Sequence, residues 1–493
     1  MEHFDLVVLG GGPAGYTAAA KASSSGMRTL LFESDKLGGV CLNEGCIPTK
    51  VMLNSSKLLY YAKNGAPYGI LAGSSSGDGG DVEFHISHQA VLARKEKAIR
   101  TLAAGVRSKL KTSGATVSLG RAAITGKVAG GFALTQLTGD ESGRQISAER
   151  ILVATGSSPS IPPISGIQQG LESDFVMTSS EALSLIDLPK KLVIVGGGVI
   201  GLELADYYVS TGASVTIVEI LNRVAYPMEF EVSKILMMNL QKKGVKFMLG
   251  CELNEIILPG AINVDGGNAG VLIKPVDGNN GTENVFIQAD KVLIAIGRKP
   301  NVSDIGLEEL GVYVERGAIV TDDFMRTNVH NIYAAGDVNG KSMLAHTAYR
   351  EAECAVAHML GNPDKMNYHS IPSIIYTNPE VAGVGETEES AATKGLTVKT
   401  IKIPMRYSGR YIAETESGDG ICKIVFDTKK DTIIGVHIIG SYASEIILAA
   451  QYMIESRHSV DALLKTVFAH PTIGEILREA MILYRDQGLG IRD

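Results

Sequence analysis

The sequence is poor in cysteine, in long apolar runs and in excess positive charge. Only 5 of its 493 residues are cysteine, which excludes the disulfide-dense scaffold of a small secreted domain. No stretch approaches 18 uninterrupted apolar residues, so we expect no membrane span. The formal net charge of −7 lacks the clustered basic surface that nucleic-acid binding requires. These absences indicate a protein without nucleic-acid or membrane partners.

The amino terminus also lacks a secretory signal. MEHF leads directly into the strand-like DLVVLG, without a basic region, an apolar stretch and a small-residue cleavage site. We therefore expect a cytoplasmic protein. The chain is too long for one hydrophobic core, so we expect three or four domains. Its content of 45% hydrophobic and 20% charged residues is typical of a well-packed globular protein.

Glycine is plentiful, and its spacing near the amino terminus is informative. An apolar strand, a glycine turn, an alanine-rich helix and a second strand follow one another, with Gly10, Gly12 and Gly15 forming G-x-G-x-x-G. The first glycine makes the tight turn, the second lets the backbone approach a pyrophosphate, and the third lets helix and strand pack closely. Glu33 closes the second strand, where its carboxylate can accept hydrogen bonds from a ribose.

The same unit recurs in the middle of the chain. Gly196, Gly198 and Gly201 form the second glycine motif, and Glu219 closes its second strand. The first glycine and the closing glutamate lie 23 residues apart in both units. One such motif is weak, but two in the same strand–turn–helix–strand context predict two bound dinucleotides. Glu219 favours NAD over NADP, because a carboxylate repels a 2′-phosphate.

Three further segments have the pattern of strands that end in turns, at residues 149–160, 290–301 and 331–340. The first two turn at Gly156 and Gly297. The third ends at Asp337. An aspartate at the carboxyl end of a parallel strand lies where ligands bind in such sheets, and it is equally an ordinary helix N-cap.

Taken in order, these motifs resemble the pyridine nucleotide–disulfide oxidoreductases. The first glycine motif, C-x4-C, A-T-G (Ala154–Gly156), the second glycine motif and A-A-G-D (Ala334–Asp337) span almost the whole chain. The resemblance implies an α/β fold with two Rossmann-like dinucleotide-binding domains, for FAD and NAD, and a C-terminal α+β dimerisation domain. The implied bounds are 1–150 for FAD, 151–280 for NAD, 281–350 for a central segment that completes the FAD site, and 351–493 for the interface.

The resemblance also implies which residues bind the two cofactors. The residues expected to hold FAD are Gly10, Gly12, Gly15, Glu33 and Asp337, and those expected to hold NAD are Gly196, Gly198, Gly201 and Glu219. Gly156 and Gly297 are further candidates for cofactor contact. We expect no metal site.

Cys41 and Cys46 are the only cysteines close together in sequence, so they are a metal site, a structural disulfide or a redox pair. In a continuous helix their Cα atoms would lie about 8.6 Å apart, beyond the roughly 7 Å that a disulfide tolerates, so a bond requires distortion, which Gly45 permits. A structural role is poorly motivated because so small a loop stabilises a fold little. Zinc would need two more ligands at comparable spacing, and none follows. A reversible redox pair fits best.

By resemblance, Cys41 exchanges with the substrate disulfide and Cys46 lies against the flavin in a charge-transfer contact. Lys50 lies near the reactive nitrogen of the flavin and pairs with Glu203. Taken alone, Lys50 and Glu203 are equally typical of solvated surface charges.

Near the carboxyl terminus, FAHPTIGEIL contains His470 and Glu475. A thiolate is the nucleophile in disulfide exchange, and histidine is a suitable base near neutral pH. The segment matches the terminal H-P-T…E motif of the family, in which both residues come from the partner subunit of a homodimer. Phe468 stands where the related enzymes commonly have another histidine.

Within the family, GGVCLNEGCIPTK, GGGVIGLELA, IGRKPN, MLAHTAYREAE and YTNPEVAGVGETEE are most similar to the dihydrolipoamide dehydrogenases. The implied reaction oxidises protein-bound dihydrolipoyl groups and passes electrons through the cysteine pair and FAD to NAD+. The implied partners are the lipoyl domains of 2-oxoacid dehydrogenase complexes or of the glycine cleavage system. A glutathione- or mercuric-reductase-like enzyme and a flavin NADH oxidase are the alternatives. Residues 73–80, GSSSGDGG, predict a flexible surface insertion.

Overall fold

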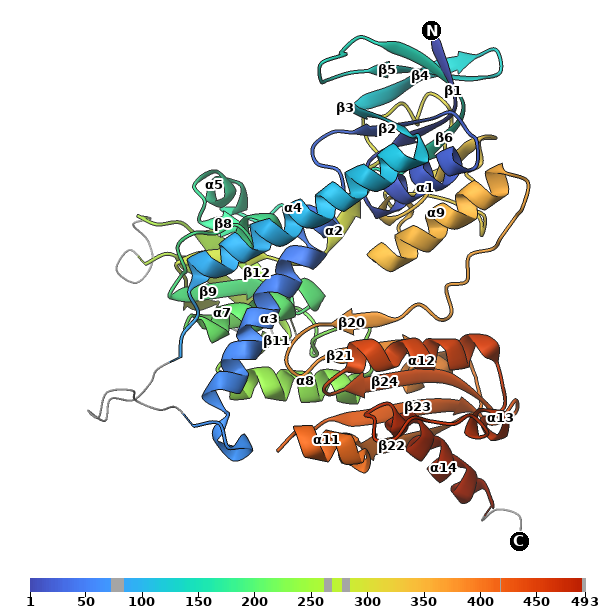
Figure 1. The fold of residues 1–493 in the computed structure, drawn as a ribbon. Coiled ribbons are helices and arrows are strands. Elements are labelled where there is room, and N and C mark those ends of the chain that lie inside the picture. The colour runs from blue at the N-terminus through green and yellow to red at the C-terminus, as the bar shows by residue number, and fades with distance from the viewer. Residues whose placement is uncertain (72–83, 261–267, 277–283, 417, 490–493) are drawn as a thin grey trace.

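The computed structural model describes residues 1–71, 84–260, 268–276, 284–416 and 418–489. The insertion predicted at 73–80 lies outside the described residues. The described chain folds into three units, each built on its own sheet (Figure 1). Within these ranges, no helix is long and apolar enough to cross a membrane.

The first unit is built on a seven-stranded sheet with the order β3-β2-β1-β6-β5-β4, in which β19 also pairs with β6. Its strands are β1 Glu2–Leu9, β2 Thr29–Glu33, β3 Thr116–Leu119, β4 Ala122–Val128, β5 Gly131–Gln136, β6 Gln145–Val153 and β19 Ile332–Ala334. β1 pairs in parallel with β2 and β6, whereas β4, β5 and β6 pair antiparallel. Successive residues of β1 enter cores on opposite faces, Leu6 and Val8 on one and Val7 and Leu9 on the other. Because both faces are covered, β1 is apolar throughout its second half.

Helices cover one face of this sheet and lead away from it. They are α1 Pro13–Ser24, α2 Gly39–Glu44, α3 Cys46–Lys63, η1 Ala66–Tyr68, α4 His88–Ser113 and α9 Ala345–Met359. The buried alanines of α1 let it pack closely against the sheet and α9. Figure 1 shows α3 and α4 running from the first unit past the second.

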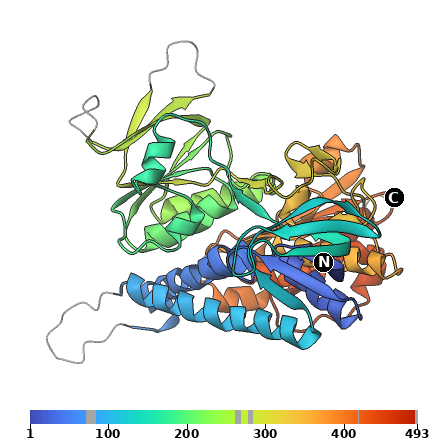
Figure 2. The same ribbon diagram turned by 90° about the horizontal axis from the view of Figure 1, so that it is seen from above.

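The second unit is built on a parallel sheet with the order β11-β10-β9-β15-β8. Its strands are β8 Val176–Met177, β9 Lys191–Val195, β10 Ser214–Glu219, β11 Lys246–Leu249 and β15 Lys291–Ile294, and its helices are α5 Ile167–Glu172, α6 Ser179–Ala182, α7 Val199–Ser210 and α8 Phe230–Lys242. An antiparallel sheet of β12 Cys251–Ile257, β13 Gly270–Pro275 and β14 Val285–Gln288 projects from it. Figure 2 shows this unit beside the first.

One boundary differs from the division expected from the sequence. The expected central segment begins at residue 281, yet β15 pairs with β8 and β9 of the second sheet. After β11 the chain leaves the second sheet to form the antiparallel sheet of β12, β13 and β14, and β15 then returns to the second sheet. The chain rejoins the first unit only afterwards, where β19 pairs with β6. Two short antiparallel strand pairs also lie in this part of the fold. One joins β7 Ser157–Pro159 to β16 Arg298–Pro300, and the other joins β17 Val314–Glu315 to β18 Ala318–Ile319. The short helix η2 Asp337–Asn339 follows β19.

The third unit is an antiparallel sheet with the order β20-β21-β24-β23-β22. Its elements are β20 Ser373–Ile375, β21 Val381–Gly385, α10 Glu388–Thr393, β22 Val398–Pro404, η3 Met405–Tyr407, α11 Gly409–Glu414, β23 Ile421–Asp427, β24 Thr432–Ile439, α12 Ala443–Ser456, α13 Val460–Leu464 and α14 Glu475–Leu489. Alternate residues of β23 and β24 form one core with α12 and α14. The three sheets give the predicted α/β fold with a C-terminal α+β unit.

Candidate active site

The cysteine pair lies at a break between two helices. α2 ends at Glu44 and α3 begins at Cys46, because Gly45 leaves the helical region at φ −145° and ψ −104°. A Cβ on Gly45 would lie only 3.1 Å from the Val40 carbonyl oxygen, so the turn is tight. Cys41 and Cys46 form a disulfide with their Cα atoms 4.7 Å apart. The break supplies the distortion that the spacing requires.

Lys50 follows one helical turn after the disulfide. Its Nζ lies 2.9 and 3.1 Å from the two carboxylate oxygens of Glu203 on α7, and Glu203 is only 3% exposed. The backbone N–H of Tyr376, directly after β20, donates to the same carboxylate at 2.9 Å, and the Tyr376 ring centroid lies 4.5 Å from Lys50 Nζ. Side chains of the first and second units and a strand end of the third therefore meet beside the disulfide.

The two glycine turns have matching geometry. Gly10 and Gly196 have φ of +104° and +112°, a region that L side chains rarely adopt. A Cβ on Gly15 would lie 1.8 Å from the Gly10 carbonyl oxygen, and a Cβ on Gly201 would lie 2.2 Å from the Gly196 carbonyl oxygen. Only glycine fits at these close approaches of helix and strand.

Each unit leaves the amino end of its helix open. α1 begins after Gly12 and α7 after Gly198, and no side chain caps either helix. Nothing lies within 4 Å of a Cβ built on Gly198. Uncapped N–H groups at a helix start, with room beside them, suit a pyrophosphate.

The closing glutamates occupy equivalent places in the two units. Gly11 N–H donates to Glu33 Oε2 at 2.8 Å, and Gly197 N–H donates to Glu219 Oε2 at 2.6 Å. Each carboxylate is thus held against its glycine turn. Both sites fit a dinucleotide whose ribose meets the carboxylate and whose pyrophosphate meets the helix start.

Asp337 lies where β19 meets the first sheet. It is the first residue of η2, whose N-cap is Gly336, so the alternative of a capping aspartate does not apply. Ser157 Oγ donates to Asp337 Oδ2 at 2.5 Å. Gly156, with φ +69°, and Gly297, with φ +125°, occupy the turns after β6 and β15 with open space beside them.

Two residues that the sequence analysis did not select support these positions. Glu351 on α9 is 0% exposed and accepts the Gly336 N–H at 2.6 Å beneath the Asp337 turn. Burial raises the pKa of Glu351, although hydrogen bonds, the first from Tyr368, lower it in part. Tyr376 is the second such residue. The only sequence signals were the places of Glu351 in MLAHTAYREAE and of Tyr376 at the start of YTNPEVAGVGETEE.

His470 precedes α14 in the third unit. Its Nδ1 lies 2.9 Å from Glu475 Oε1, and the Thr472 N–H donates to Glu475 Oε2 at 2.8 Å. These two contacts lower the pKa of Glu475. The His470 side chain is 78% exposed, and among the described residues only Glu475 hydrogen-bonds its ring. Within one chain, therefore, no hydrogen bond joins His470 to Cys41.

The third unit also exposes large apolar side chains. Leu448 and Tyr452 of α12 are 69% and 71% exposed, and Val467, close to His470, is 94% exposed. Exposed apolar side chains of this size are typical of an interaction surface.

Comparison with known proteins agrees with this architecture. Residues 4–352 match the pyridine nucleotide-disulphide oxidoreductase family, and residues 371–481 match its dimerisation domain. A dihydrolipoyl dehydrogenase from Chlorobaculum tepidum is 37% identical, with 97% of this chain and 96% of the relative covered. One from Chlamydia muridarum is 34% identical, with 99% and 98% covered, and the mitochondrial one from Sus scrofa is 36% identical, with 97% and 89% covered.

Solved structures match over nearly the whole chain as well. LpdA from Mycobacterium tuberculosis superposes with a TM-score of 0.85 at 26% identity, with 98% of this chain and 100% of that chain covered. The flavoprotein disulfide reductase RclA from Escherichia coli, at 24% identity and a TM-score of 0.81 over 98% and 100%, shares the fold. By family match and by full-length relatives, the chain belongs to the pyridine nucleotide–disulphide oxidoreductases.

Proposed function

We propose that the protein is a dihydrolipoyl dehydrogenase, which oxidises dihydrolipoyl groups to the lipoyl disulfide and reduces NAD+. The observation that carries the proposal is the Cys41–Cys46 disulfide beside the Lys50–Glu203 pair, in a chain whose full-length relatives have this name. FAD and NAD are the cofactors of that group. The match to the dimerisation domain supports a homodimer.

The cysteine chemistry balances as a two-electron exchange. One substrate thiolate attacks Cys41 Sγ, breaks the Cys41–Cys46 bond and leaves Cys46 as a thiolate. The second substrate thiolate then attacks the substrate sulfur of the mixed disulfide, which releases Cys41 and the oxidised substrate. His470 of the partner subunit accepts the protons of the two substrate thiols in turn and passes them to solvent, and Glu475 holds its ring. FAD held at the first glycine turn would supply the two-electron acceptor that reoxidises the cysteine pair, and NAD+ held at the second glycine turn would be the final acceptor.

The remaining residues hold and orient the cofactors. In the proposal the first glycine turn, Glu33 and Asp337 hold FAD, and the second glycine turn and Glu219 hold NAD. Lys50 places a positive charge where electron density arrives, and Glu203 fixes that charge. The division into FAD, NAD, central and interface segments belongs to the same proposal, with the central segment beginning after β15.

Lipoyl domains of 2-oxoacid dehydrogenase complexes or of the glycine cleavage system are the proposed partners, in the cytoplasm. The glutathione- and mercuric-reductase alternatives are less well supported. Glu219 stands where NADP-dependent glutathione reductases carry arginine, and the full-length relatives are named dihydrolipoyl dehydrogenases. A flavin NADH oxidase is also less well supported, because its reaction needs no thiol base.

The test is a comparison of substrates with purified protein. We expect NAD+ reduction by free dihydrolipoamide, with kcat/KM for NAD+ well above that for NADP+. Oxidised glutathione with NADH or NADPH is the competing assay. The matched variant is Glu219→Ala, which should narrow the preference for NAD+ because the carboxylate no longer repels the 2′-phosphate. Faster turnover of glutathione than of dihydrolipoamide would overturn the proposal.

A further inference from the structure

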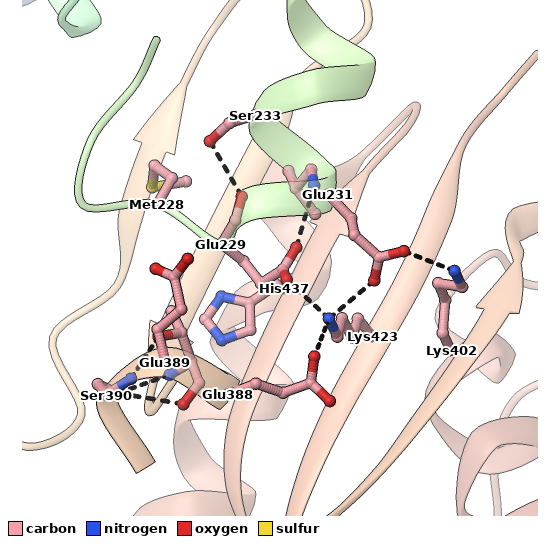
Figure 3. Close-up of polar contacts among 12 residues, drawn as sticks. Met228, Glu229, Glu231, Ser233, Glu388, Glu389, Ser390, Lys402, Lys423 and His437 are labelled. Carbon is pink, nitrogen blue, oxygen red and sulfur yellow. Dashed lines mark hydrogen bonds and ion pairs between the residues drawn. The ribbon is translucent and has the colours of Figure 1, made fainter. Parts of the chain in front are cut away.

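A lysine is buried between the second and third units (Figure 3). Lys423 of β23 is only 3% exposed, and its Nζ donates to Glu229 Oε1 at 2.7 Å, to Glu231 Oε2 at 2.8 Å and to Glu388. All three N–H groups of the ammonium therefore have a carboxylate partner. Lys402 of β22 pairs with the outer side of Glu231 at 2.6 Å.

The partners come from two units. Glu229 and Glu231 lie at the start of α8 in the second unit, whereas Lys423 and Glu388 belong to the third. Glu229 is itself 3% exposed, and its other oxygen accepts the Val232 N–H at the first turn of α8. The cluster, defined as Lys423 with Glu229, Glu231 and Glu388, thus ties the start of α8 to the sheet of the third unit.

Attraction between opposite charges holds the cluster together. Carboxylate oxygens of the three glutamates lie within 4.8 Å of one another, and the Lys423 ammonium is the cation that they share. Burial lowers the pKa of Lys423, but the hydrogen bonds that Lys423 donates to the glutamates outweigh burial and raise the pKa. Removing one member of such a buried set leaves a charge uncompensated.

The chain between Glu219 and the cluster is anchored a second time. Arg223 donates from Nη1 to both oxygens of Glu389 in the third unit at 2.9 Å, and from Nη2 to the Met228 carbonyl at 2.7 Å. The Ala225 N–H donates to the Gly197 carbonyl at 2.8 Å. Residues 220–231 therefore connect the glycine turn and Glu219 directly to the third unit.

We propose that Lys423 is a positioning residue for the nicotinamide nucleotide: by fixing the start of α8 against the third unit, it holds residues 220–231 and thereby Glu219 and the second glycine turn in their binding geometry. The proposal rests on the assignment of NAD to the second unit. Lys423 lies in another domain and touches no nucleotide-binding residue. Its effect is expected on affinity for NAD+, because preorganisation of a site contributes to binding.

The chain offers a matched control in the same pair of elements. Lys242, at the end of α8, pairs with Asp419 of the third unit at 2.6 Å, but these side chains are 62% and 53% exposed. Exposed pairs contribute little. Lys242→Met therefore removes an inter-unit ion pair and one lysine without disturbing the cluster.

The experiment compares FAD-loaded Lys423→Met and Lys242→Met with wild type. The readouts are Kd for NAD+ by calorimetry, KM for NAD+ and for dihydrolipoamide, and kcat at saturating NAD+. We expect Lys423→Met to raise Kd and KM for NAD+ by about fivefold or more through lost preorganisation. KM for dihydrolipoamide and kcat should stay within about twofold of wild type, since the disulfide and base are untouched. A chelator is present, so that a divalent ion does not replace the ammonium among the carboxylates.

A second variant keeps the test decisive if Lys423→Met folds poorly. Lys423→Met/Glu229→Gln removes both buried charges and retains their shapes, while Glu231 and Glu388, with side chains 36% and 48% exposed, remain solvated. We expect a folded protein with normal FAD content and the same weakening of NAD+ binding. A folded variant with Kd for NAD+ within twofold of wild type would overturn the inference.

Glu219→Ala separates failure of the inference from failure of the assignment. If Glu219→Ala alters neither affinity nor preference for NAD+, the second unit does not bind the nucleotide as proposed. If it alters them and Lys423→Met does not, only the positioning role of Lys423 is refuted. If Lys423→Met loses stability but its Kd for NAD+ is unchanged, the cluster has only a structural role and the inference is refuted.

Discussion

At the scale of single residues, the two cysteines of the disulfide are expected to have different roles because their positions in the fold differ. Cys41 lies within the short helix α2. Cys46 is the first residue of α3, one turn before Lys50. A thiolate at a helix start beside a cation is stabilised. In the proposal, Cys46 is therefore the thiolate against the flavin, and Cys41 is the sulfur that exchanges with the substrate.

Single serine substitutions test this division of roles. Cys41→Ser should abolish dihydrolipoamide turnover and leave Cys46 as a thiolate, so long-wavelength charge-transfer absorbance should appear without reductant. Cys46→Ser should lose activity and that absorbance together. Visible spectra of the two oxidised, FAD-loaded variants make the measurement. Identical spectra would refute the assignment.

At the scale of elements, the strand–turn–helix unit depends on contacts that no larger side chain tolerates. Gly201→Ala would place a Cβ 2.2 Å from the Gly196 carbonyl oxygen. We expect the helix to move away from the turn and NAD+ binding to be lost, while FAD, held in the first unit, is retained. Gly105→Ala in α4, where nothing lies within 4 Å, is the control and should leave both unchanged. NAD+ titration and the flavin content of the purified variants decide the outcome.

The junction of α8 and α10 with the third sheet should be sensitive to acid. Hydrogen bonds from Lys402 and then Lys423 lower the pKa of Glu231. Burial raises the pKa of Glu388, but its hydrogen bonds with Lys423 and Thr400 and the charge of Lys423 together outweigh burial and lower the pKa. Carboxyls with depressed pKa values stabilise the fold above their ordinary value of 4.5, and this stabilisation is lost as pH falls through the folded value.

The melting temperature of wild type should therefore exceed that of Lys423→Met by a constant amount near neutral pH, and the gap should shrink below about pH 4.5 as these carboxyls protonate. Removing one partner of a buried pair typically costs about 3–5 kcal/mol. Thermal scans of both proteins from pH 7 downwards measure the gap. A gap that does not change with pH would show that the lysine acts through packing alone.

At the scale of the whole molecule, one chain holds the disulfide and the base on units that do not bring them together. His470 is 78% exposed and contacts Glu475, and its unit carries exposed apolar side chains on α12 and at Val467. A homodimer covers such a surface, and in the proposal it also delivers His470 to Cys41 of the other chain.

Mixed dimers test this arrangement. His470→Ala should cost about 10²–10⁴-fold in rate through lost general-base catalysis, and Glu475→Ala should cost less. After subunit exchange, a dimer of one Cys41→Ser and one His470→Ala chain has one site with both residues and one with neither. Activity per mixed dimer should recover to about half of wild type. Exchange verified by mass without recovery would place thiol and base in the same chain.

The sequence alone determined the features that depend on local backbone chemistry. Both glycine turns, the break permitted by Gly45 and the α/β class follow from residue type and spacing, because glycine and alternating apolar residues restrict the backbone within a few positions. Family membership followed from the order of those motifs.

Only the tertiary structure decided which distant residues meet. Glu351 beneath the Gly336 turn, Tyr376 against Lys50 and Lys423 among three glutamates come from segments far apart in the chain. A lone lysine or glutamate in a sequence is typical of a solvated surface, and it becomes a buried partner only when folding removes water and supplies the opposite charge. The tertiary structure also decided that β15 pairs with the second sheet, since strand pairing depends on the partner strand as much as on the strand itself.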